Sequence, residues 1–154
     1  MSSTLKLMFQ CAFMAMVPVI ELRGALPWGI TQGLPVPLAY GLCVVCNMIP
    51  VPFILLFINK ILEWMDGHPT LCPISQWIEE HGHKKLEKYQ KYHMLGLFLL
   101  VAIPLPGTGA WTGALVAALT KLPMRKAFPM ILLGVAAAGI IVLLVTVGAV
   151  AVFG

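Results

Sequence analysis

Apolar runs of two different lengths alternate with short breaks along this chain. The runs over 36–58 and 128–153 are each long enough, as helices, to cross the roughly 30 Å hydrocarbon core of a bilayer. The runs over 5–20 and 94–103 reach only about 24 Å and about 15 Å, and each is followed by a break and a short return run. We therefore predict an all-α integral membrane protein with two re-entrant helical hairpins and two spanning helices.

A single membrane domain over 1–154 then divides into five segments. We place the first re-entrant hairpin over 5–35, a spanning helix over 36–59, a polar loop over 60–93, the second hairpin over 94–121 and a second spanning helix over 124–153. Apolar residues recur at roughly helical spacing within the polar loop: Ile74, Trp77, Ile78, Leu86 and Tyr89. This spacing predicts an amphipathic helix, either lying on the membrane surface or solvated in the cytoplasm.

Glycines and prolines mark the points at which the apolar runs are expected to break. They are Gly24 and Pro27 in the first hairpin, and Pro104, Pro106, Gly107 and Gly109 in the second. Pro50 and Pro52 lack the N–H that a helix needs, so we expect a kink in the first spanning helix and free carbonyls near Asn47. Asn47 is the predicted partner of those carbonyls.

A short internal repeat relates the two halves of the chain. The sequence GALPWG over 24–29 has an echo in GAWTG over 109–113, and the Leu-Pro pair at 34–35 has one at 122–123. If each half crosses the membrane once, the second hairpin enters from the face opposite to the first. That arrangement is an inverted-topology repeat, in which broken helices from both halves meet at the midplane.

Composition and charge favour this plan over four full spans. Sixty per cent of the residues are apolar and 10% are charged, against about 25% charged in a soluble domain. With two hairpins, eight basic residues lie on the face of the polar loop and Lys6 alone on the other; with four spans the division is six against four. The positive-inside rule therefore places 60–93 in the cytoplasm and both termini outside, in a multi-pass protein of the cell inner membrane.

Glu21 and Arg23 interrupt the apolar first third of the chain. At bilayer mid-depth either charge costs roughly 2.5 to 3.5 kcal/mol, so such residues face protein, water or a charged ligand. The planar fork of Arg23 matches phosphate or carboxylate, which predicts recognition of an anion; the alternative is a clasp to Glu21 or to hairpin carbonyls. Glu21 is the candidate for a coupling proton, because its protonation responds to whether Arg23 is occupied; the alternative is a permanent ion pair.

Three polar or aromatic residues stand at the tip of the second hairpin, opposite the charged pair in the predicted fold. The hydroxyls of Thr108 and Thr112 can donate to a substrate oxygen or coordinate Na⁺; the alternative is that they cap their own backbone. We assign proton coupling to Glu21. We assign substrate binding to six residues: Arg23, Glu21, Asn47, Thr108, Trp111 and Thr112.

Several function classes have no support in the sequence. The four histidines, at 68, 81, 83 and 93, fit no closed metal site, and the pair Cys43 and Cys46 lacks a second ligand pair, so we expect no metal and buried, inert cysteines. No nucleophile and base pair or phosphate-binding Gly-Lys-Ser motif is present, which argues against an enzyme. The lysines within 84–91 are too mixed with acids for nucleic-acid binding.

Three motifs resemble those of a known family: ELRGALP over 21–27, NMIPVPF over 47–53 and IPLPGTGAWTG over 103–113. The family is labelled small multidrug export proteins and is bacterial and archaeal; the similarity covers nearly the whole chain. The order of hairpins and helices is also similar to the wider DedA/VTT membrane protein superfamily. That resemblance implies lipid scrambling or flipping, including of undecaprenyl phosphate carriers, with proton or sodium coupling. The second hairpin of that superfamily carries arginines, whereas residues 102–113 contain none.

Together these observations predict a membrane transporter that moves an anionic substrate, such as a lipid phosphate, through a midplane site between the hairpins. H⁺ or Na⁺ is the expected coupling ion, and no other cofactor is expected. The expected partners are membrane lipids, including a polyprenyl phosphate, and a second copy of the chain, because a homodimer would seal a buried polar site. The alternatives are a small-molecule (multidrug) or ion exporter, and a non-transporting membrane scaffold.

Overall fold

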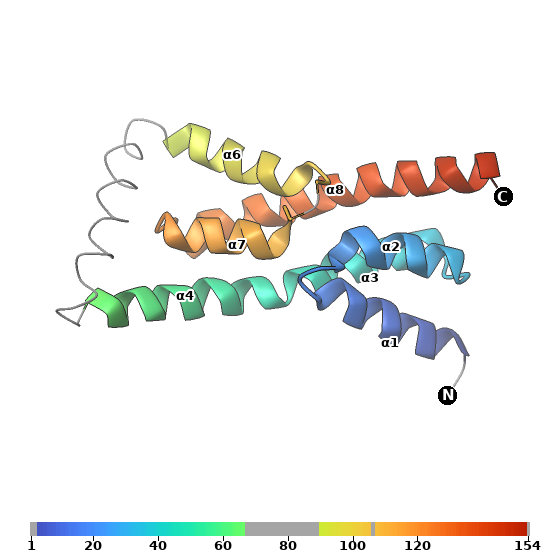
Figure 1. Ribbon diagram of the computed structural model, residues 1–154, viewed down its shortest axis with the longest axis horizontal. Helices are drawn as coiled ribbons and strands as arrows, with labels where there is room; N and C mark the ends of the chain where they lie inside the picture. The colour runs from blue at the N-terminus through green and yellow to red at the C-terminus, as the bar shows by residue number, and fades with distance from the viewer. Residues whose placement is uncertain (1–2, 67–89, 106, 154) are drawn as a thin grey trace.

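The computed structural model describes residues 3–66, 90–105 and 107–153, in which every regular element is a helix (Figure 1). These helices are α1 (Ser3–Met16), α2 (Glu21–Thr31), α3 (Val36–Met48), α4 (Pro50–Asp66), α6 (Gln90–Ala102), α7 (Ala110–Leu119) and α8 (Met124–Phe153). The prediction of an all-helical chain is confirmed for these residues. The amphipathic helix predicted from 74–89 lies outside them.

Two helical tracks run along the whole bundle. α3 and α4 form one track, which contains the apolar stretch Val36–Ile61 with a mean hydropathy of 2.4. α8 forms the other, with a mean hydropathy of 2.8 over Met124–Val152. Both stretches are long and apolar enough to cross a membrane, so the prediction of two long apolar helices is confirmed. The two chain termini lie at the same end of the bundle (Figure 1).

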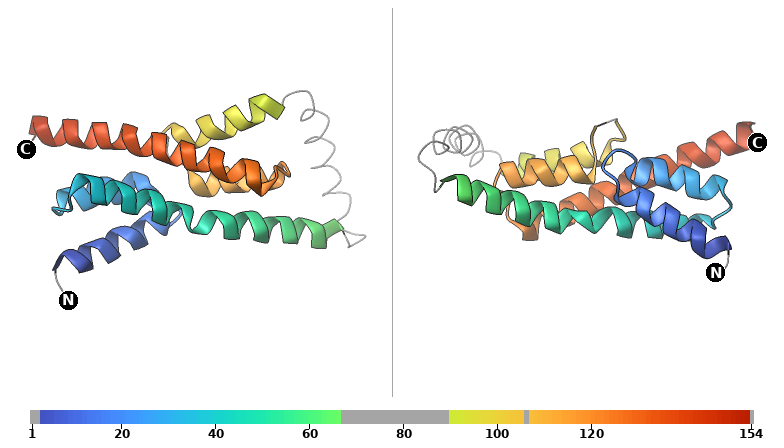
Figure 2. Two further views of the ribbon diagram at one scale, coloured as in Figure 1. Left: turned by 180° about the vertical axis from the view of Figure 1, so that it is seen from behind. Right: turned by 60° about the horizontal axis from the view of Figure 1, so that its bottom comes forward.

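Two helical hairpins lie beside these tracks and come from opposite ends of the bundle (Figures 1 and 2). α1 and α2 come from the end that holds the termini and pack on each other and on α3. α6 and α7 come from the other end, where α6 packs on α8 and α7 packs on α4. The arms are 10 to 14 residues long, or about 15–21 Å, so the two hairpin tips meet near the middle of the bundle.

The turn of the first hairpin lies at residues 17–20, between α1 and α2. Pro18 has no N–H to donate to the carbonyl of Met14, which ends the regular hydrogen bonding of α1. The N–H of Glu21 donates to the Val17 carbonyl at 2.9 Å, and the backbone of Glu21 has a φ of 49°. A non-glycine residue in this left-handed region is strained, so the surrounding structure must hold Glu21 in place.

The sequence predicted this turn at Gly24 and Pro27, and the structure corrects that prediction, because both residues lie within α2. Pro27 leaves the carbonyl of Arg23 without its intrahelical donor, and the helix nevertheless continues to Thr31. Gly24 allows α2 to pass close to the turn, since a Cβ there would lie 2.6 Å from Cγ2 of Ile20. The glycine therefore serves close packing within the hairpin.

Other boundaries also differ from the prediction. The interruption expected near Pro50 and Pro52 is confined to Ile49, whose N–H donates to the Cys46 carbonyl at 3.3 Å in a tighter turn. α4 continues to Asp66 and α6 begins at Gln90, so both ends of the predicted polar loop are helical. In the second hairpin, Pro104, Gly107 and Gly109 lie between α6 and α7, and Pro106 is outside the described residues.

α2 and α7 end in the same kind of cap. The residue with positive φ is Gly33 (95°) after α2 and Lys121 (51°) after α7. The following residue, Leu34 or Leu122, donates its N–H across the cap to the carbonyl five residues back, at 3.0 Å and 2.9 Å. The repeated Leu-Pro pair therefore marks the same local structure in each half of the chain.

Small residues let α6 approach α7 and α8 closely at its C-terminal end. A Cβ at Gly134 would lie 2.7 Å from Cβ of Val101, and a Cβ at Gly113 would lie 2.5 Å from Cγ2 of the same residue. Val101 is buried in the core. This packing holds the end of α6, and the backbone carbonyls exposed there, against the middle of the bundle.

Candidate functional site

Glu21 begins α2 at the point where the two hairpin tips meet, and its side chain reaches across to the second hairpin. The residue is 6% exposed, and its Oε1 accepts a 3.4 Å hydrogen bond from the backbone N–H of Trp111 in the first turn of α7. The first N–H groups of a helix lack intrahelical partners and carry partial positive charge. A carboxylate from the first hairpin therefore completes the N-terminal end of a helix in the second.

Arg23 plays the corresponding part at the C-terminal end of α6. Its Nη1 donates to the Leu105 carbonyl at 2.8 Å, and its Nη2 donates to the carbonyls of Val101 and Ile103 at 3.2 Å and 3.1 Å. Nη2 also donates to Oγ1 of Thr108 at 3.1 Å. The last carbonyls of a helix lack donors and carry partial negative charge, so the guanidinium matches them in hydrogen bonding and in charge. This structure therefore contains the clasp to hairpin carbonyls that was the alternative to anion recognition.

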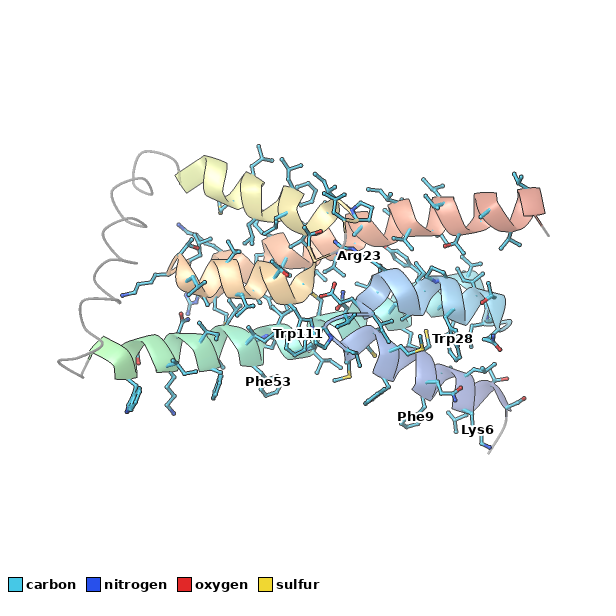
Figure 3. All side chains as sticks on the ribbon, in the orientation of Figure 1. Lys6, Phe9, Arg23, Trp28, Phe53 and Trp111 are labelled. Carbon is cyan, nitrogen blue, oxygen red and sulfur yellow. The ribbon has the colours of Figure 1, made fainter. Side chains whose placement is uncertain are left out.

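Trp111 makes the reciprocal contact from the second hairpin to the first. Its indole N–H donates to the carbonyl of Met16, the last residue of α1, at 3.1 Å. Arg23 and Trp111 both lie near the middle of the bundle, where the tips face each other (Figure 3). Three side chains from the two tips thus complete helix ends that belong to the opposite hairpin.

Gly109 allows the closest approach between the tips. A Cβ at this position would overlap the Glu21 carboxylate, so any larger residue would push the tips apart. Glu21 and Gly109 each precede the capping residues Gly33 and Lys121 by twelve positions. The two halves therefore place a carboxylate and a glycine at matching positions, and these two residues meet.

Thr108 and Thr112 form hydrogen bonds within the second hairpin. Oγ1 of Thr108 lies 2.9 Å from the carbonyls of both Ile103 and Leu105, and Oγ1 of Thr112 donates to the Gly107 carbonyl at 2.8 Å. A hydroxyl has one proton and two lone pairs, so Thr108 can donate to its own backbone while it accepts from a guanidinium. Capping of their own backbone, the alternative role for these threonines, is present in this structure.

A pocket of about 480 Å³ lies between the two hairpin tips. Its lining comes from both hairpins: residues 18–21, Arg23, Gly24, Pro104, Leu105, Gly107, Thr108 and Thr112. The rim contains exposed apolar side chains, with Val19 90% and Leu105 55% exposed. The pocket therefore combines a charged interior with an apolar rim, halfway along the bundle.

A much smaller cavity, of about 10 Å³, borders the same two charges. Glu21, Arg23 and Asn47 all line it. Asn47 is 2% exposed, and its Oδ1 accepts no hydrogen bond from the described residues. Asn47 was predicted to bond the carbonyls freed by Pro50 and Pro52. Its side chain donates to no carbonyl among the described residues, and its Oδ1 is left as an unpaired acceptor.

The structure thus distributes the six predicted site residues over three places. Glu21, Arg23, Thr108 and Thr112 line the larger pocket, Asn47 lines the smaller cavity, and Trp111 joins the tips through its backbone and indole N–H groups. Sequence reasoning missed the apolar rim at Val19 and Leu105. The signal available was that both are apolar residues beside a helix-breaking proline.

None of the described cysteines lines the pocket or the smaller cavity. Cys11, Cys43 and Cys46 are buried and free, and Cys72 is outside the described residues. Sγ of Cys11 lies 3.4 Å from Sγ of Cys43, across the contact between α1 and α3. Within the described part of the chain, no group of three or more His, Cys, Asp or Glu side chains is arranged to hold a metal ion.

Comparison with known proteins gives one family match. The family model described as "Putative small multi-drug export protein" matches residues 21–141 of the chain. No curated protein and no solved structure matches the chain. The matched range begins at Glu21 and contains every side chain described above that crosses between the two hairpin tips.

Proposed function

Because the chain belongs to the small multi-drug export protein family, we propose that it is a membrane transporter whose substrate passes between two re-entrant hairpins. The observation that carries the proposal is the pocket of about 480 Å³, which Arg23, Thr108 and Thr112 line. Arg23 lies near the middle of the bundle (Figure 3). Ionisable residues at membrane mid-depth are costly, and they typically mark a substrate or ion pathway.

The membrane arrangement in this proposal is an inverted-topology repeat of hairpin and spanning helix. It is supported by the opposite directions of the two hairpins and by the matching caps after α2 and α7. Four basic residues lie in α4 and around the start of α8, at the end away from the termini: Lys60, Lys121, Arg125 and Lys126. Lys6 lies near the termini (Figure 3). By the positive-inside rule, the end away from the termini and the loop 60–93 then face the cytoplasm, and we propose the cell inner membrane as the location of the protein.

We propose a substrate with an anionic group and an apolar part, as in a lipid phosphate. Arg23 supplies the positive charge of the pocket, and the hydroxyls of Thr108 and Thr112 supply further polar contacts. The exposed side chains of Val19 and Leu105 at the rim suit an apolar chain that stays in the lipid while the anionic group enters. The likeness to the DedA/VTT superfamily remains a prediction, because the description of the matching family mentions only export and not that superfamily.

Substrate binding and movement of the hairpins would be linked through Arg23. An anion that binds the guanidinium competes with the carbonyls of Ile103 and Leu105 for the same N–H groups. Its binding therefore weakens the clasp between the tips and favours their separation. Glu21 gives a second link, because its neutralisation by H⁺, or by Na⁺ bound beside it, weakens its attraction to the N-terminal end of α7.

Transbilayer movement of a short-chain polyprenyl phosphate in proteoliposomes tests the proposal. We expect movement with wild type that is lost in Arg23→Ala and Glu21→Gln, with a pH or Na⁺ gradient as the drive. Arg125→Ala is the matched control, because Arg125 is exposed in the first turn of α8, away from the pocket. No movement above empty liposomes under any gradient removes lipid phosphate as the substrate.

Arg23→Lys separates recognition from charge. Lysine keeps the positive charge but loses the planar fork, so transport falls if the anion is bound by two parallel hydrogen bonds. Equal transport by Arg23→Lys and wild type contradicts that role and leaves Arg23 as a positive charge that holds the tips.

A small-molecule or ion exporter is the second candidate function. It is favoured by the family description and by the lack of arginine over 102–113, which leaves Arg23 as the only cation among the described residues that line the pocket. Efflux of fluorescent drugs from proteoliposomes, again with Arg23→Ala and Arg125→Ala, measures it. A non-transporting scaffold would leave every transport assay at the level of empty liposomes, while Arg23→Ala still lowers stability.

A further inference from the structure

We infer that Asn47 is a positioning residue for Glu21, and that its Oδ1 accepts a hydrogen bond from the protonated Glu21 carboxyl, directly or through one water. The hydrogen bond forms in the cavity of about 10 Å³ that both residues line. The inference rests on the proposed function, in which Glu21 takes up a proton during transport.

The first argument is the unpaired oxygen of Asn47. The residue is 2% exposed, and its Oδ1 has no partner among the described residues. A buried amide oxygen without a donor is costly, because it has lost its hydrogen bonds to water and gained none. A leucine of similar shape would avoid that cost at this position in α3. An asparagine is explained if a donor is present in another state of the protein.

The second argument is the chemistry of the cavity. The cavity has room for about one water molecule, and most of its remaining lining is apolar: Leu22, Val101, Ala110, Val135 and Ala138. Arg23 lines the cavity as well and already balances the charge of ionised Glu21. A bound Na⁺ would find only two oxygen-bearing side chains, Glu21 and Asn47, among the residues that line this cavity. A proton on Glu21 needs neither further ligands nor further space.

Other ionisable groups on the surrounding helices lie elsewhere. Tyr40 donates to the Ala136 carbonyl at 2.9 Å, and the thiols of Cys11 and Cys43 contact each other. The other charged side chains that the structure describes on α1, α4 and α8 do not line the cavity: Lys6, Lys60, Glu63, Arg125 and Lys126. Cys46 precedes Asn47 on α3 and does not line the cavity. Arg23 is therefore the charged group that faces Glu21 among the described residues.

The two protonation states then have different partners. Ionised Glu21 accepts from the N–H of Trp111 at the start of α7. Protonated Glu21 has an O–H group that needs a hydrogen-bond acceptor. The N–H of Trp111 is itself a donor and cannot serve, whereas the unpaired oxygen of Asn47 can accept this hydrogen bond. Asn47 therefore draws the protonated carboxyl toward α3 and away from the second hairpin. Proton uptake loosens the contact between the tips through this exchange.

Infrared difference spectra between low and high pH test the inference on the purified protein in lipid nanodiscs. The carboxyl band that disappears in Glu21→Gln belongs to protonated Glu21. We expect this band to move to higher frequency in Asn47→Leu, because the O–H loses its acceptor. Asn47→Ser restores an acceptor and should return the band toward its wild-type position. Thr146→Val is the control, since Thr146 is buried but bonds only its own helix, at 2.7 Å to the Val142 carbonyl.

The outcomes separate this inference from the function on which it rests. An unchanged Glu21 band in Asn47→Leu overturns the role of Asn47, even if transport is proton-coupled. A band that changes when Na⁺ is replaced by N-methylglucamine at constant pH overturns the proton assignment. Absence of any pH-dependent band that depends on Glu21 removes proton uptake from the proposed function itself, and the inference falls with it.

Discussion

The Glu21 carboxylate and the backbone N–H of Trp111 form a hydrogen bond of 3.4 Å, although the two residues are 90 positions apart in the chain. Trp111 returns the contact, since its indole N–H donates to the Met16 carbonyl at 3.1 Å. Each hairpin tip therefore supplies groups that the helix ends of the other tip lack. Neither tip has its helix ends completed without the other, and substitutions at this contact should affect both.

Substitution of Gly109 by alanine tests how closely the tips approach. We expect Gly109→Ala to destabilise the protein by about 1–3 kcal/mol, because the added Cβ would overlap the Glu21 carboxylate. Thermal unfolding in detergent measures the change. Gly96→Ala is the matched control, since a Cβ at Gly96 in α6 meets nothing within 4 Å, and it should stabilise by about 0.5–1 kcal/mol.

A double substitution identifies the origin of that loss. Glu21→Ala removes the carboxylate that the new methyl group would overlap, so Gly109→Ala should cost less in a Glu21→Ala background than in wild type. Equal costs in the two backgrounds would show that Gly109 and Glu21 do not touch.

Arg23 should contribute to stability as well as to transport. Arg23→Ala removes the charged donor that the carbonyls of Ile103 and Leu105 share, and we expect a loss of about 1.5–3 kcal/mol in unfolding experiments. Arg125→Ala removes an exposed arginine and should change stability by no more than about 0.5 kcal/mol. Similar effects of the two substitutions would argue against the clasp.

Asn47→Leu should raise stability while it impairs transport. It replaces an amide whose Oδ1 is buried and unpaired by an apolar side chain of similar size, and we expect a gain of about 1 kcal/mol. Unfolding in detergent and transport in proteoliposomes, made on the same preparation, measure the two effects. A clear loss of stability at high pH, where Glu21 is ionised, would mean that the amide oxygen is paired in that state of the folded protein.

Membrane topology distinguishes two hairpins from four full spans. Gln32 and Pro123 are exposed, each beside the cap at the end of a hairpin's return arm. With re-entrant hairpins, a cysteine at 32 reacts with an impermeant maleimide from outside, and a cysteine at 123 reacts only after the membrane is permeabilised. With four spans both positions lie on the same side. A cysteine-free background is the starting point, and equal labelling of the two positions from one side contradicts the hairpins.

Oxidative cross-linking tests the contact between α1 and α3. The sulfur atoms of Cys11 and Cys43 are 3.4 Å apart, against about 2.05 Å in a disulfide, so a small shift allows a bond. In a variant with Cys46→Ala and Cys72→Ala, membrane-permeant copper phenanthroline, with O₂ as the electron acceptor, should protect both thiols from a maleimide added after denaturation. The same variant with Cys11→Ser should keep its remaining thiol reactive. Free thiols in both would place α1 away from α3.

The sequence alone determined the helical class of the protein and the two lengths of its helices. The thickness of the hydrocarbon core sets how many apolar residues a spanning helix needs. The runs over 36–58 and 128–153 are long enough, so they could be predicted to form the two long helices. The charges of Glu21 and Arg23 were also informative. A charged side chain in the hydrocarbon core is costly in free energy, so each of them could be expected to have a polar partner. The first turn was misplaced, since glycine and proline at 24 and 27 are tolerated within α2 once that helix packs on its neighbours.

Only the tertiary structure decided which groups the charged pair would contact. Glu21 accepts from a backbone N–H of Trp111, and Arg23 donates to backbone carbonyls such as that of Leu105. Every residue except proline carries that N–H and every residue carries that carbonyl, so no side-chain pattern can mark the partners in advance. They become available because two helices end at the same depth, and the packing of one hairpin against the other brings those ends to Glu21 and Arg23.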